Sequence, residues 1–212
     1  RAPAPNRDVE KAASGPGGEE RPAEFTDPLT QSETRHRIAL AEGVTSWQVV
    51  EELKQVSGLT GDIAELPAEG TLAPDSYEIK SGDNRAAVIA RMVDAQTAIL
   101  DAAWKNRVDG LPLASKEEAL ILASIIEKET GVPEERRQVA SVFINRLNQG
   151  MPLQTDPAVI YGITKGKGVL GRGLRQSELR GETPWNTYRI KGLPPTPIAN
   201  PGKASIEAAL DP

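Results

Sequence analysis

The chain has 212 residues, 25 basic and 30 acidic side chains, a net charge of −5 and no cysteine. The missing cysteine excludes disulfide bonds and thiol chemistry, and the single histidine, His36, leaves almost no room for a histidine-based triad or a multi-histidine metal site. No basic stripe with interleaved aromatic residues occurs, so we expect no nucleic-acid partner. Because cysteine is absent and histidine occurs once, we expect no metal site and chemistry carried by carboxylates, hydroxyls, amides or lysine.

The first part of the chain is expected to contain an arm and a small lobe. Residues 1–34 are rich in Ala, Pro, Gly and Glu without a periodic apolar pattern, which predicts a linker or a disordered arm. Residues 35–83 predict a small α+β lobe: a strand at its start, a helix capped by Thr45 or Ser46, and a turn followed by a second strand within residues 69–77.

Residues 84–212 predict a mainly helical lobe, so the expected fold class is α+β. The expected elements are a helix at 84–106, a helix at 116–130, a helix opened by Pro133 and, within a loop-rich stretch at 151–200, a short helix after Asp156-Pro157. Ser115, with Glu118 three residues later, has the sequence pattern of a capping box and predicts the start of the second helix. No apolar run in the sequence is long enough to span a bilayer.

One carboxylate of the second helix falls on its apolar face. A helix advances by about 100° per residue, so with Leu122 at zero Ile125 lies at about −60° and Ile126 at about +40°. Glu129 lies at about −20°, inside this stripe, whereas Glu127 lies at about +140° on the other side. The pattern predicts that Glu129 is withdrawn from solvent and that Glu127 is exposed or supports a neighbouring residue.

A withdrawn carboxylate is either paired or functional, because burying a bare carboxylate costs several kcal/mol. Desolvation favours the protonated acid, and a protonated glutamate in a cleft can give the leaving oxygen of a glycosidic bond its proton. In the structural alternative, Glu129 at the helix end points to solvent or pairs with Arg136 or Arg137. Periodicity alone favours the structural alternative.

Several longer motifs follow one another along the chain. In chain order they are Leu122–Thr130, Val139–Leu147, Met151–Pro157, Val159–Gly162, Asn186–Tyr188, Gly192–Pro195 and Pro197–Gly202, preceded by Glu42-Gly43, Glu69-Gly70 and Pro74–Tyr77. This series resembles the YceG-like endolytic murein transglycosylases (the MltG family). The resemblance covers residues 35–212, and several motifs in the right order are far more specific than any one of them.

The resemblance implies that Glu129, the second glutamate of the Glu-Lys-Glu-Thr motif, is the catalytic residue of a lysozyme-like lobe. It implies a lytic transglycosylase that cuts the MurNAc–GlcNAc β-1,4 bond within peptidoglycan strands without water. Glu129 would first protonate the glycosidic oxygen as general acid. As general base it would then accept the proton of the MurNAc 6-hydroxyl, which attacks C1 and closes a 1,6-anhydro ring, so that neither a second carboxylate nor a cofactor is required.

The resemblance also implies a location and partners. Peptidoglycan glycan strands would be the substrate, at the extracytoplasmic face of the bacterial inner membrane (the periplasm), with peptidoglycan synthases or divisome proteins as further candidate partners. Members of the family usually carry an N-terminal membrane helix and a small LysM-like lobe, and they continue past the Ala-Ala-Leu-Asp-Pro segment. Neither the helix nor the LysM-like lobe is recognisable here, so we expect a membrane anchor in the full-length protein that this chain lacks.

Eight polar side chains are expected to line the sugar-binding cleft. They are Glu69, Asp75, Gln154, Thr155, Asp156, Asn186, Thr187 and Tyr188. Each has a structural alternative: Glu69 and Asp75 flank a turn, Asp156 before Pro157 is a ready N-cap, and residues 186–188 could form a loop held by its own hydrogen bonds.

Two other functions remain open at this stage. A lysozyme-type muramidase would hydrolyse the same bond with Glu129 and with Asp156 as the second carboxylate, and its product ends would be heavier by one water. A non-catalytic glycan-binding module of the cell envelope would keep its binding when Glu129 is replaced with glutamine.

Overall fold

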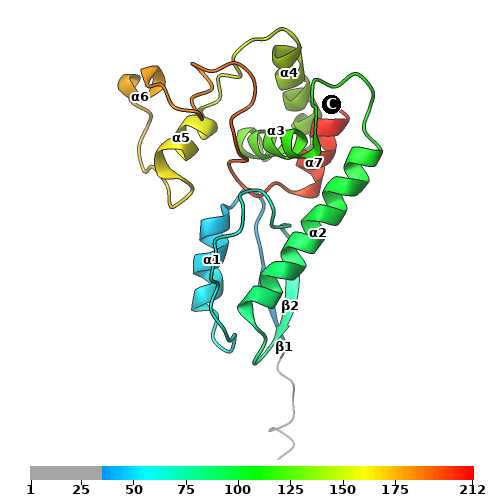
Figure 1. Ribbon diagram of the computed structural model, residues 1–212, viewed down its shortest axis with the longest axis vertical. Helices are drawn as coiled ribbons and strands as arrows, with labels where there is room; N and C mark the ends of the chain where they lie inside the picture. Colours follow the sequence, from blue (N-terminus) through cyan, green and yellow to red (C-terminus); the bar gives the residue numbers. More distant parts are fainter. Residues whose placement is uncertain (1–34) are drawn as a thin grey trace, which may run out of the picture. The chain divides into compact units, whose positions relative to one another are not determined.

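The computed structural model describes residues 35–212, and the expected arm at 1–34 lies outside them. The described part is an α+β fold with seven α-helices and one two-stranded sheet (Figure 1). The elements are β1 (Arg35–Ala39), α1 (Ser46–Gln55), β2 (Ser76–Lys80), α2 (Arg85–Lys105), α3 (Lys116–Glu129), the 3₁₀ turn η2 (Pro133–Glu135), α4 (Arg136–Asn148), α5 (Asp156–Thr164), α6 (Gln176–Arg180) and α7 (Lys203–Leu210).

The strands and α1 enclose a small hydrophobic core. β1 and β2 pair antiparallel, with Ile38 opposite Tyr77. Thr45 caps α1, because its side chain accepts the Gln48 N–H while the Gln48 side chain accepts the Thr45 N–H. The buried residues of this core are Leu40, Val49, Val50, Leu53, Leu59, Leu72, Tyr77, Ile79, Val88, Ile89 and Met92. The last three come from α2, so the first half of that helix completes the small core.

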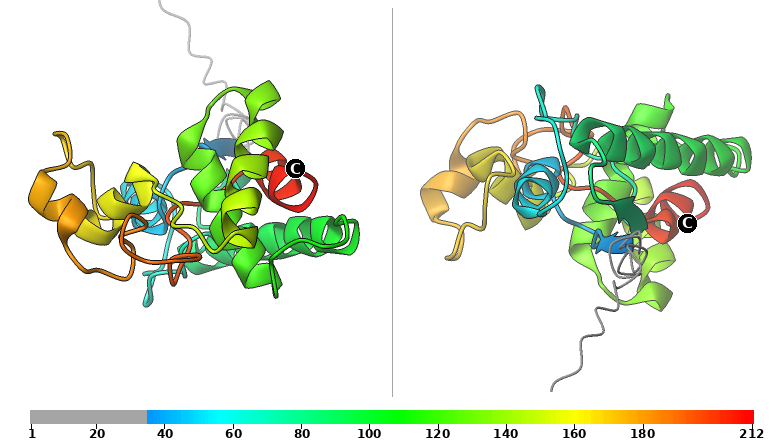
Figure 2. Two further views of the ribbon diagram at one scale, coloured as in Figure 1. Left: turned by 90° about the horizontal axis from the view of Figure 1, so that it is seen from above. Right: turned by 90° about the horizontal axis from the view of Figure 1, so that it is seen from below.

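A larger core surrounds α3. In Figure 1, α3 lies at the centre of the helical lobe, and it packs against α2, α4, α5 and α7. Every residue of α3 from Ala119 to Ile126 is buried. The second half of α2 contributes Ile99, Leu100 and Ala103 to this core and runs alongside α7 (Figure 2). A single long helix therefore contributes residues to both cores.

Two buried amides tie the cores together near residue 200. Gln96 Nε2 donates to the carbonyls of Gly70 and Pro201, at 3.0 Å each. Asn200 accepts the Leu72 N–H at 3.0 Å and donates to the Val44 carbonyl at 3.0 Å. Because buried amides are costly without partners, these bonds fix the β1–α1 turn and the segment between α1 and β2 against the segment that leads into α7.

The structure confirms most of the expected elements and adds two. The starts of α1, α2 and α3 lie directly after Thr45, Asn84 and Ser115, whose side chains each accept a backbone N–H. The short helices α6 and α7 were not expected. α7 follows a Pro/Gly-rich segment and has no side-chain cap, but its buried Ile206 and Leu210 pack into the larger core, which stabilises a helix of only eight residues.

The alternative in which Asp156 caps α5 is wrong by one position. Thr155 is the N-cap, Asp156 and Pro157 occupy the first turn, and no side-chain bond caps this helix. The preceding Gln154 has φ 56°, a left-handed conformation that a non-glycine residue adopts only when its surroundings require it. The chain therefore bends sharply just before α5. Among the described residues, no helix is both long and apolar enough to cross a membrane.

Candidate active site

Glu129 is the last residue of α3, and its side chain is exposed. The expectation that it is withdrawn from solvent was therefore wrong. α3 is buried on all sides from Ala119 to Ile126, so its apolar stripe does not mark one face that meets the core. The run of buried residues in α3 ends at Ile126, and the side chain of Glu129 is accessible to solvent.

The hydroxyl of Thr155 donates a hydrogen bond to Oε1 of Glu129. Thr155 is itself buried and held by Thr187: the Thr155 N–H donates to Thr187 Oγ1 at 3.0 Å, and that hydroxyl donates to the Thr155 carbonyl at 3.0 Å. The Gln154 N–H donates to the Thr187 carbonyl at 3.0 Å. These bonds hold the start of α5 against the loop at 187 and aim the Thr155 hydroxyl at Glu129.

Asp156 and Tyr188 form a second polar pair beside Glu129. The Tyr188 hydroxyl donates to Asp156 Oδ1 at 2.7 Å. This hydrogen bond, together with burial and the nearby negative charges of Asp156 and Glu129, raises the pKa of Tyr188 to about 12. Asp156 is exposed and Tyr188 is half-buried. Glu129, Thr155, Asp156 and Tyr188 therefore form one cluster of chemically active side chains.

Arg146 of α4 supports this cluster, and the sequence analysis did not single it out. Its Nη1 donates to the Leu153 carbonyl at 2.7 Å and to Oε1 of the exposed Gln154 at 3.2 Å. A guanidinium can satisfy several acceptors at once, so Arg146 holds the bend that precedes α5. The signal that could have revealed it is its position in the Asn-Arg-Leu motif, one helix before the bend.

Asn186 and Thr187 were expected to contact sugar, and in this structure both are buried against other parts of the protein. Both residues are 0% exposed. Asn186 Nδ2 lies within hydrogen-bond distance of the carbonyls of Glu178, Leu179 and Gly181, and its Oδ1 accepts the Tyr188 N–H at 3.1 Å. Asn186 shapes the loop that presents Tyr188, and Thr187 holds Thr155, so both residues position others. The buried Thr155 likewise faces Glu129 and offers almost no surface to a ligand.

Glu69 and Asp75 lie in the small lobe, and their described contacts do not include the Glu129 cluster. Glu69 Oε1 accepts the N–H of Ser46 at 2.7 Å, which places a carboxylate at the N-terminus of α1. Burial raises the pKa of Glu69, while hydrogen bonds from Ser46 and the Tyr161 hydroxyl act in the opposite direction. Asp75 is exposed and accepts the Ser76 N–H at 2.6 Å. Asp75 thus has a local role in its turn, whereas Glu69 bonds to Ser46 and Tyr161, which are distant in the sequence.

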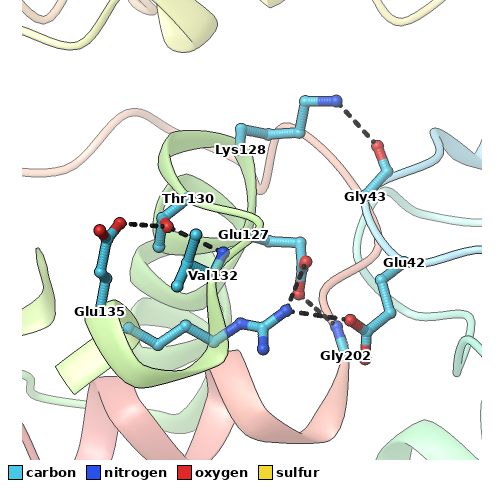
Figure 3. Close-up of polar contacts among 9 residues, drawn as sticks. Glu42, Gly43, Glu127, Lys128, Thr130, Val132, Glu135 and Gly202 are labelled. Carbon is cyan, nitrogen blue, oxygen red and sulfur yellow. Dashed lines mark hydrogen bonds and ion pairs between the residues drawn. The ribbon is translucent and has the colours of Figure 1, made fainter.

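Glu127 was expected to be exposed or to support a neighbour, and only the second description holds. Its side chain is 5% exposed and lies 3.5 Å from Arg136 Nη2 through Oε1. Its Oε2 accepts the Gly202 N–H at 2.9 Å. Figure 3 shows Glu127 among these partners at the end of α3. The two glutamates of the Glu-Lys-Glu-Thr motif thus have different surroundings: one is paired and buried, the other open to solvent.

The model of the YceG-like family matches residues 18–212 of this chain. The chain belongs to the YceG-like family. It is similar to the endolytic murein transglycosylase of Bacillus subtilis, with 38% identity over 146 residues, which are 69% of this chain and 39% of the relative. It is 32% identical over 148 residues to the endolytic murein transglycosylase of Streptococcus pneumoniae, which are 68% of this chain and 26% of the relative. The chain therefore spans less than half the length of either relative.

A crystal structure of a YceG-like protein from Listeria monocytogenes has a similar fold. Its TM-score is 0.64 at 30% sequence identity, and the match covers 82% of this chain and 65% of that one. The YceG-like resemblance seen in the sequence is therefore confirmed by both sequence and structure.

Four of the sequence motifs of this YceG-like chain meet around Glu129. The first motif is the second half of α3, the second lies in α4 and supplies Arg146, and the third leads through Gln154 into α5. The Asn186–Tyr188 motif packs against the start of α5. Within residues 35–212, no group of three histidine, aspartate or glutamate side chains is arranged to hold a metal ion. Of the two carboxylates in the cluster, Asp156 is bonded to the Tyr188 hydroxyl and Glu129 to the Thr155 hydroxyl.

Proposed function

We propose that this chain is the catalytic part of an endolytic peptidoglycan lytic transglycosylase that cleaves the MurNAc–GlcNAc β-1,4 bond. The observation that carries the proposal is the solvent-accessible carboxylate of Glu129, held at a helix end by the Thr155 hydroxyl. Membership of the YceG-like family and two relatives named as endolytic murein transglycosylases support it.

In this mechanism Glu129 acts twice. As general acid it gives its proton to the glycosidic oxygen, and the bond between C1 of MurNAc and that oxygen breaks. As general base it then takes the proton of the MurNAc 6-hydroxyl, whose oxygen forms the new bond to C1. The product is a 1,6-anhydro-MurNAc end, and Glu129 regains its proton, so no water is consumed.

Because Glu129 is exposed in the free protein, the bound substrate has to exclude water from this carboxyl group. Desolvation of a carboxyl group favours its protonated form. A glycan strand that covers the site would exclude water there, so the bound strand would desolvate Glu129, which is exposed in the free protein. The Thr155 hydroxyl orients the carboxylate, because a hydrogen bond to one oxygen leaves the other free to meet the glycosidic oxygen.

Gln154, Asp156 and Tyr188 are the proposed sugar contacts. All three have accessible surface next to Glu129 or Thr155, and each carries a group that can bond to sugar hydroxyls or to the N-acetyl group. This assignment replaces the wider set of eight residues.

The wider biological setting belongs to the same proposal. We propose that the helical lobe is the lysozyme-like part, and that the protein acts on glycan strands at the extracytoplasmic face of the inner membrane. A membrane anchor elsewhere in the full-length protein, and contact with peptidoglycan synthases or divisome proteins, complete this setting.

The two alternatives differ in measurable ways. A muramidase would need Asp156 as second carboxylate, and this side chain is engaged by the Tyr188 hydroxyl. A non-catalytic module would bind strands without cutting them. Purified peptidoglycan should be digested and the new ends weighed by mass spectrometry. The proposal predicts that the wild type produces anhydro ends, which are lighter by one water than hydrolysed ends. Glu129→Gln should produce no new ends.

The full-length protein serves as the control, because this chain spans 39% of the Bacillus subtilis relative. Hydrolysed ends from either protein would favour the muramidase. Strand binding without any cleavage by the full-length protein would favour the binding module.

A further inference from the structure

The last turn of α3 is held by a different partner at each of four consecutive side chains. Lys128 Nζ donates to the Gly43 carbonyl at 3.1 Å, and Thr130 Oγ1 donates to Glu135 Oε2 at 2.9 Å (Figure 3). Glu129 accepts from Thr155, as described above. Glu127 is held by Arg136 and by the backbone of Gly202. The helix end that carries Glu129 is thus braced from several directions.

The contacts of Glu127 are the most buried of these braces. Arg136 Nη2 lies 3.5 Å from Glu127 Oε1 and 3.1 Å from Glu42 Oε2, with side-chain exposures of 9% for Arg136, 5% for Glu127 and 46% for Glu42. The Gly202 N–H completes the group. Four chain segments meet here: the turn after β1, α3, the start of α4 and the start of α7.

Gly202 shows how closely these segments approach. A Cβ atom placed on Gly202 would lie 1.9 Å from Oε1 of Glu42, so a larger residue at position 202 would require the Glu42 side chain to move. The same glycine donates its N–H to Glu127. Gly202 therefore lies next to both carboxylates of the cluster, those of Glu42 and Glu127.

Stability alone does not account for this cluster. A buried ion pair is often no more stabilising than apolar residues of the same size, because both charges lose their hydration. Here Arg136 Nε is also buried without a hydrogen-bond partner among the described residues. What the cluster supplies is geometry: a branched cation and a backbone N–H hold both oxygens of Glu127 and so fix the direction of the last helical turn.

Glu127 and Glu129 project from opposite sides of that turn. Residues two positions apart in a helix differ by about 200° in direction. The ion-pair cluster around Glu127 therefore holds one side of the helix, while Glu129 faces Thr155 on the other. We propose that Arg136 is a positioning residue: by holding Glu127 it fixes the last turn of α3 and directs the Glu129 carboxylate at the bond to be cut. This inference rests on the proposed function.

The test uses a double variant, because a single replacement of Arg136 leaves a buried, uncompensated charge. Glu127→Gln/Arg136→Met removes both charges and keeps side chains of similar length. The matched control is Arg137→Met/Asp211→Asn, which removes the neighbouring ion pair of α4, with exposures of 63% and 47%. Thermal midpoints, kcat and KM for glycan-strand cleavage, and amide exchange at Glu129 and Thr130 are measured for both.

Positioning predicts that the Glu127/Arg136 double variant keeps a thermal midpoint close to the wild type and an unchanged KM. Its kcat falls by about tenfold or more, because small misplacements of a catalytic group are expensive. The amides of Glu129 and Thr130 exchange faster, and the Arg137/Asp211 control matches the wild type in every measurement.

A double variant with wild-type kcat and wild-type exchange would overturn the proposal. If that variant does not fold, Glu127→Gln decides, since Arg136 keeps Glu42 as its counter-charge and a single carboxamide oxygen cannot serve both Arg136 and Gly202 fully. Lower kcat at constant KM supports positioning, and unchanged kcat refutes it. If the wild type cuts no strands, the proposed function fails, and the exchange measurement alone decides whether Arg136 orders the end of α3.

Discussion

The hydroxyl of Thr155 donates a hydrogen bond to Oε1 of Glu129. Thr155 is the N-cap of α5, and Glu129 is the last residue of α3. This contact joins two helix termini that are distant in sequence. The backbone of Thr155 is in turn bonded to Thr187, so the hydroxyl has little freedom to move away. The orientation of the proposed acid thus depends on a loop almost sixty residues further along the chain.

Replacing Thr155 with valine should lower kcat for strand cleavage by roughly tenfold to a hundredfold. Valine has nearly the same shape but lacks the hydroxyl, and a hydrogen bond to a charged group contributes about 1.5–3 kcal/mol. Thr155→Ser keeps the hydroxyl and serves as the matched control, with kcat within about threefold of wild type. Steady-state kinetics on glycan strands measure both. Equal kcat for valine and serine variants would mean that this hydrogen bond does not orient Glu129.

Asp156→Asn should cost less than about tenfold in kcat, because a lytic transglycosylase takes its second nucleophile from the substrate and needs one carboxylate. A two-carboxylate hydrolase would instead lose about 10²–10⁴-fold, as expected for removal of a general acid or base. Tyr188→Phe, which removes only the hydroxyl bonded to Asp156, is the companion variant. A loss at Asp156 as large as that at Glu129 would contradict the single-carboxylate mechanism.

Asn186→Ala should lower the free energy of unfolding by about 2–4 kcal/mol. The change removes the donor shared by three carbonyls and the acceptor of the Tyr188 N–H, all in a residue that is 0% exposed. Urea denaturation followed by circular dichroism measures the loss. Asn148→Ala, at the exposed end of α4, is the control and should change stability by less than about 0.5 kcal/mol. Equal stability for both variants would refute the bracing role of Asn186.

Glu69 should make the protein less stable as the pH rises. Burial raises the pKa of Glu69 above its ordinary value of 4.5, so the folded state holds this proton more tightly than the unfolded state. The stabilising contribution is complete below pH 4.5 and is lost as the pH rises through the folded-state pKa. The difference in unfolding free energy between the wild type and Glu69→Gln should therefore shift against the wild type from about pH 4 to pH 7.

Urea denaturation of both proteins at several pH values in that range measures the difference. Glutamine keeps an oxygen for the Ser46 N–H, so the comparison isolates the ionisation of Glu69. A difference that stays constant, or that moves in favour of the wild type with rising pH, would show that burial does not dominate at this carboxyl group.

The local signals of the sequence predicted the helices whose starts are marked by their own side chains. Thr45, Asn84 and Ser115 cap α1, α2 and α3, and a cap is visible from a few neighbouring residues. α7 has no such signal: it begins after Gly202 without a side-chain cap, and its stability comes from burial against α3. Such packing is set by residues distant in sequence, which periodicity cannot reveal.

The proposed site was predictable in part for a related reason. Helical periodicity singled out Glu129, but the inferred burial was wrong, because α3 is buried on all sides and its last turn leaves the core. The sequence grouped Gln154 to Asp156 with residues 186–188 only through the family resemblance, and it could not tell which of them face inward. The reciprocal bonds between Thr155 and Thr187 decide that question, and only the folded chain shows them.

The central claim is that Glu129 supplies and recovers the proton of strand cleavage. Single-turnover cleavage of glycan strands by wild type and Glu129→Gln, with strand binding measured on the same preparations, tests it most directly. The predicted result is a rate constant lower by about 10²–10⁴-fold or more for Glu129→Gln, with strand affinity within about twofold of wild type. A Glu129→Gln protein that releases anhydro-MurNAc ends at the wild-type rate would contradict it.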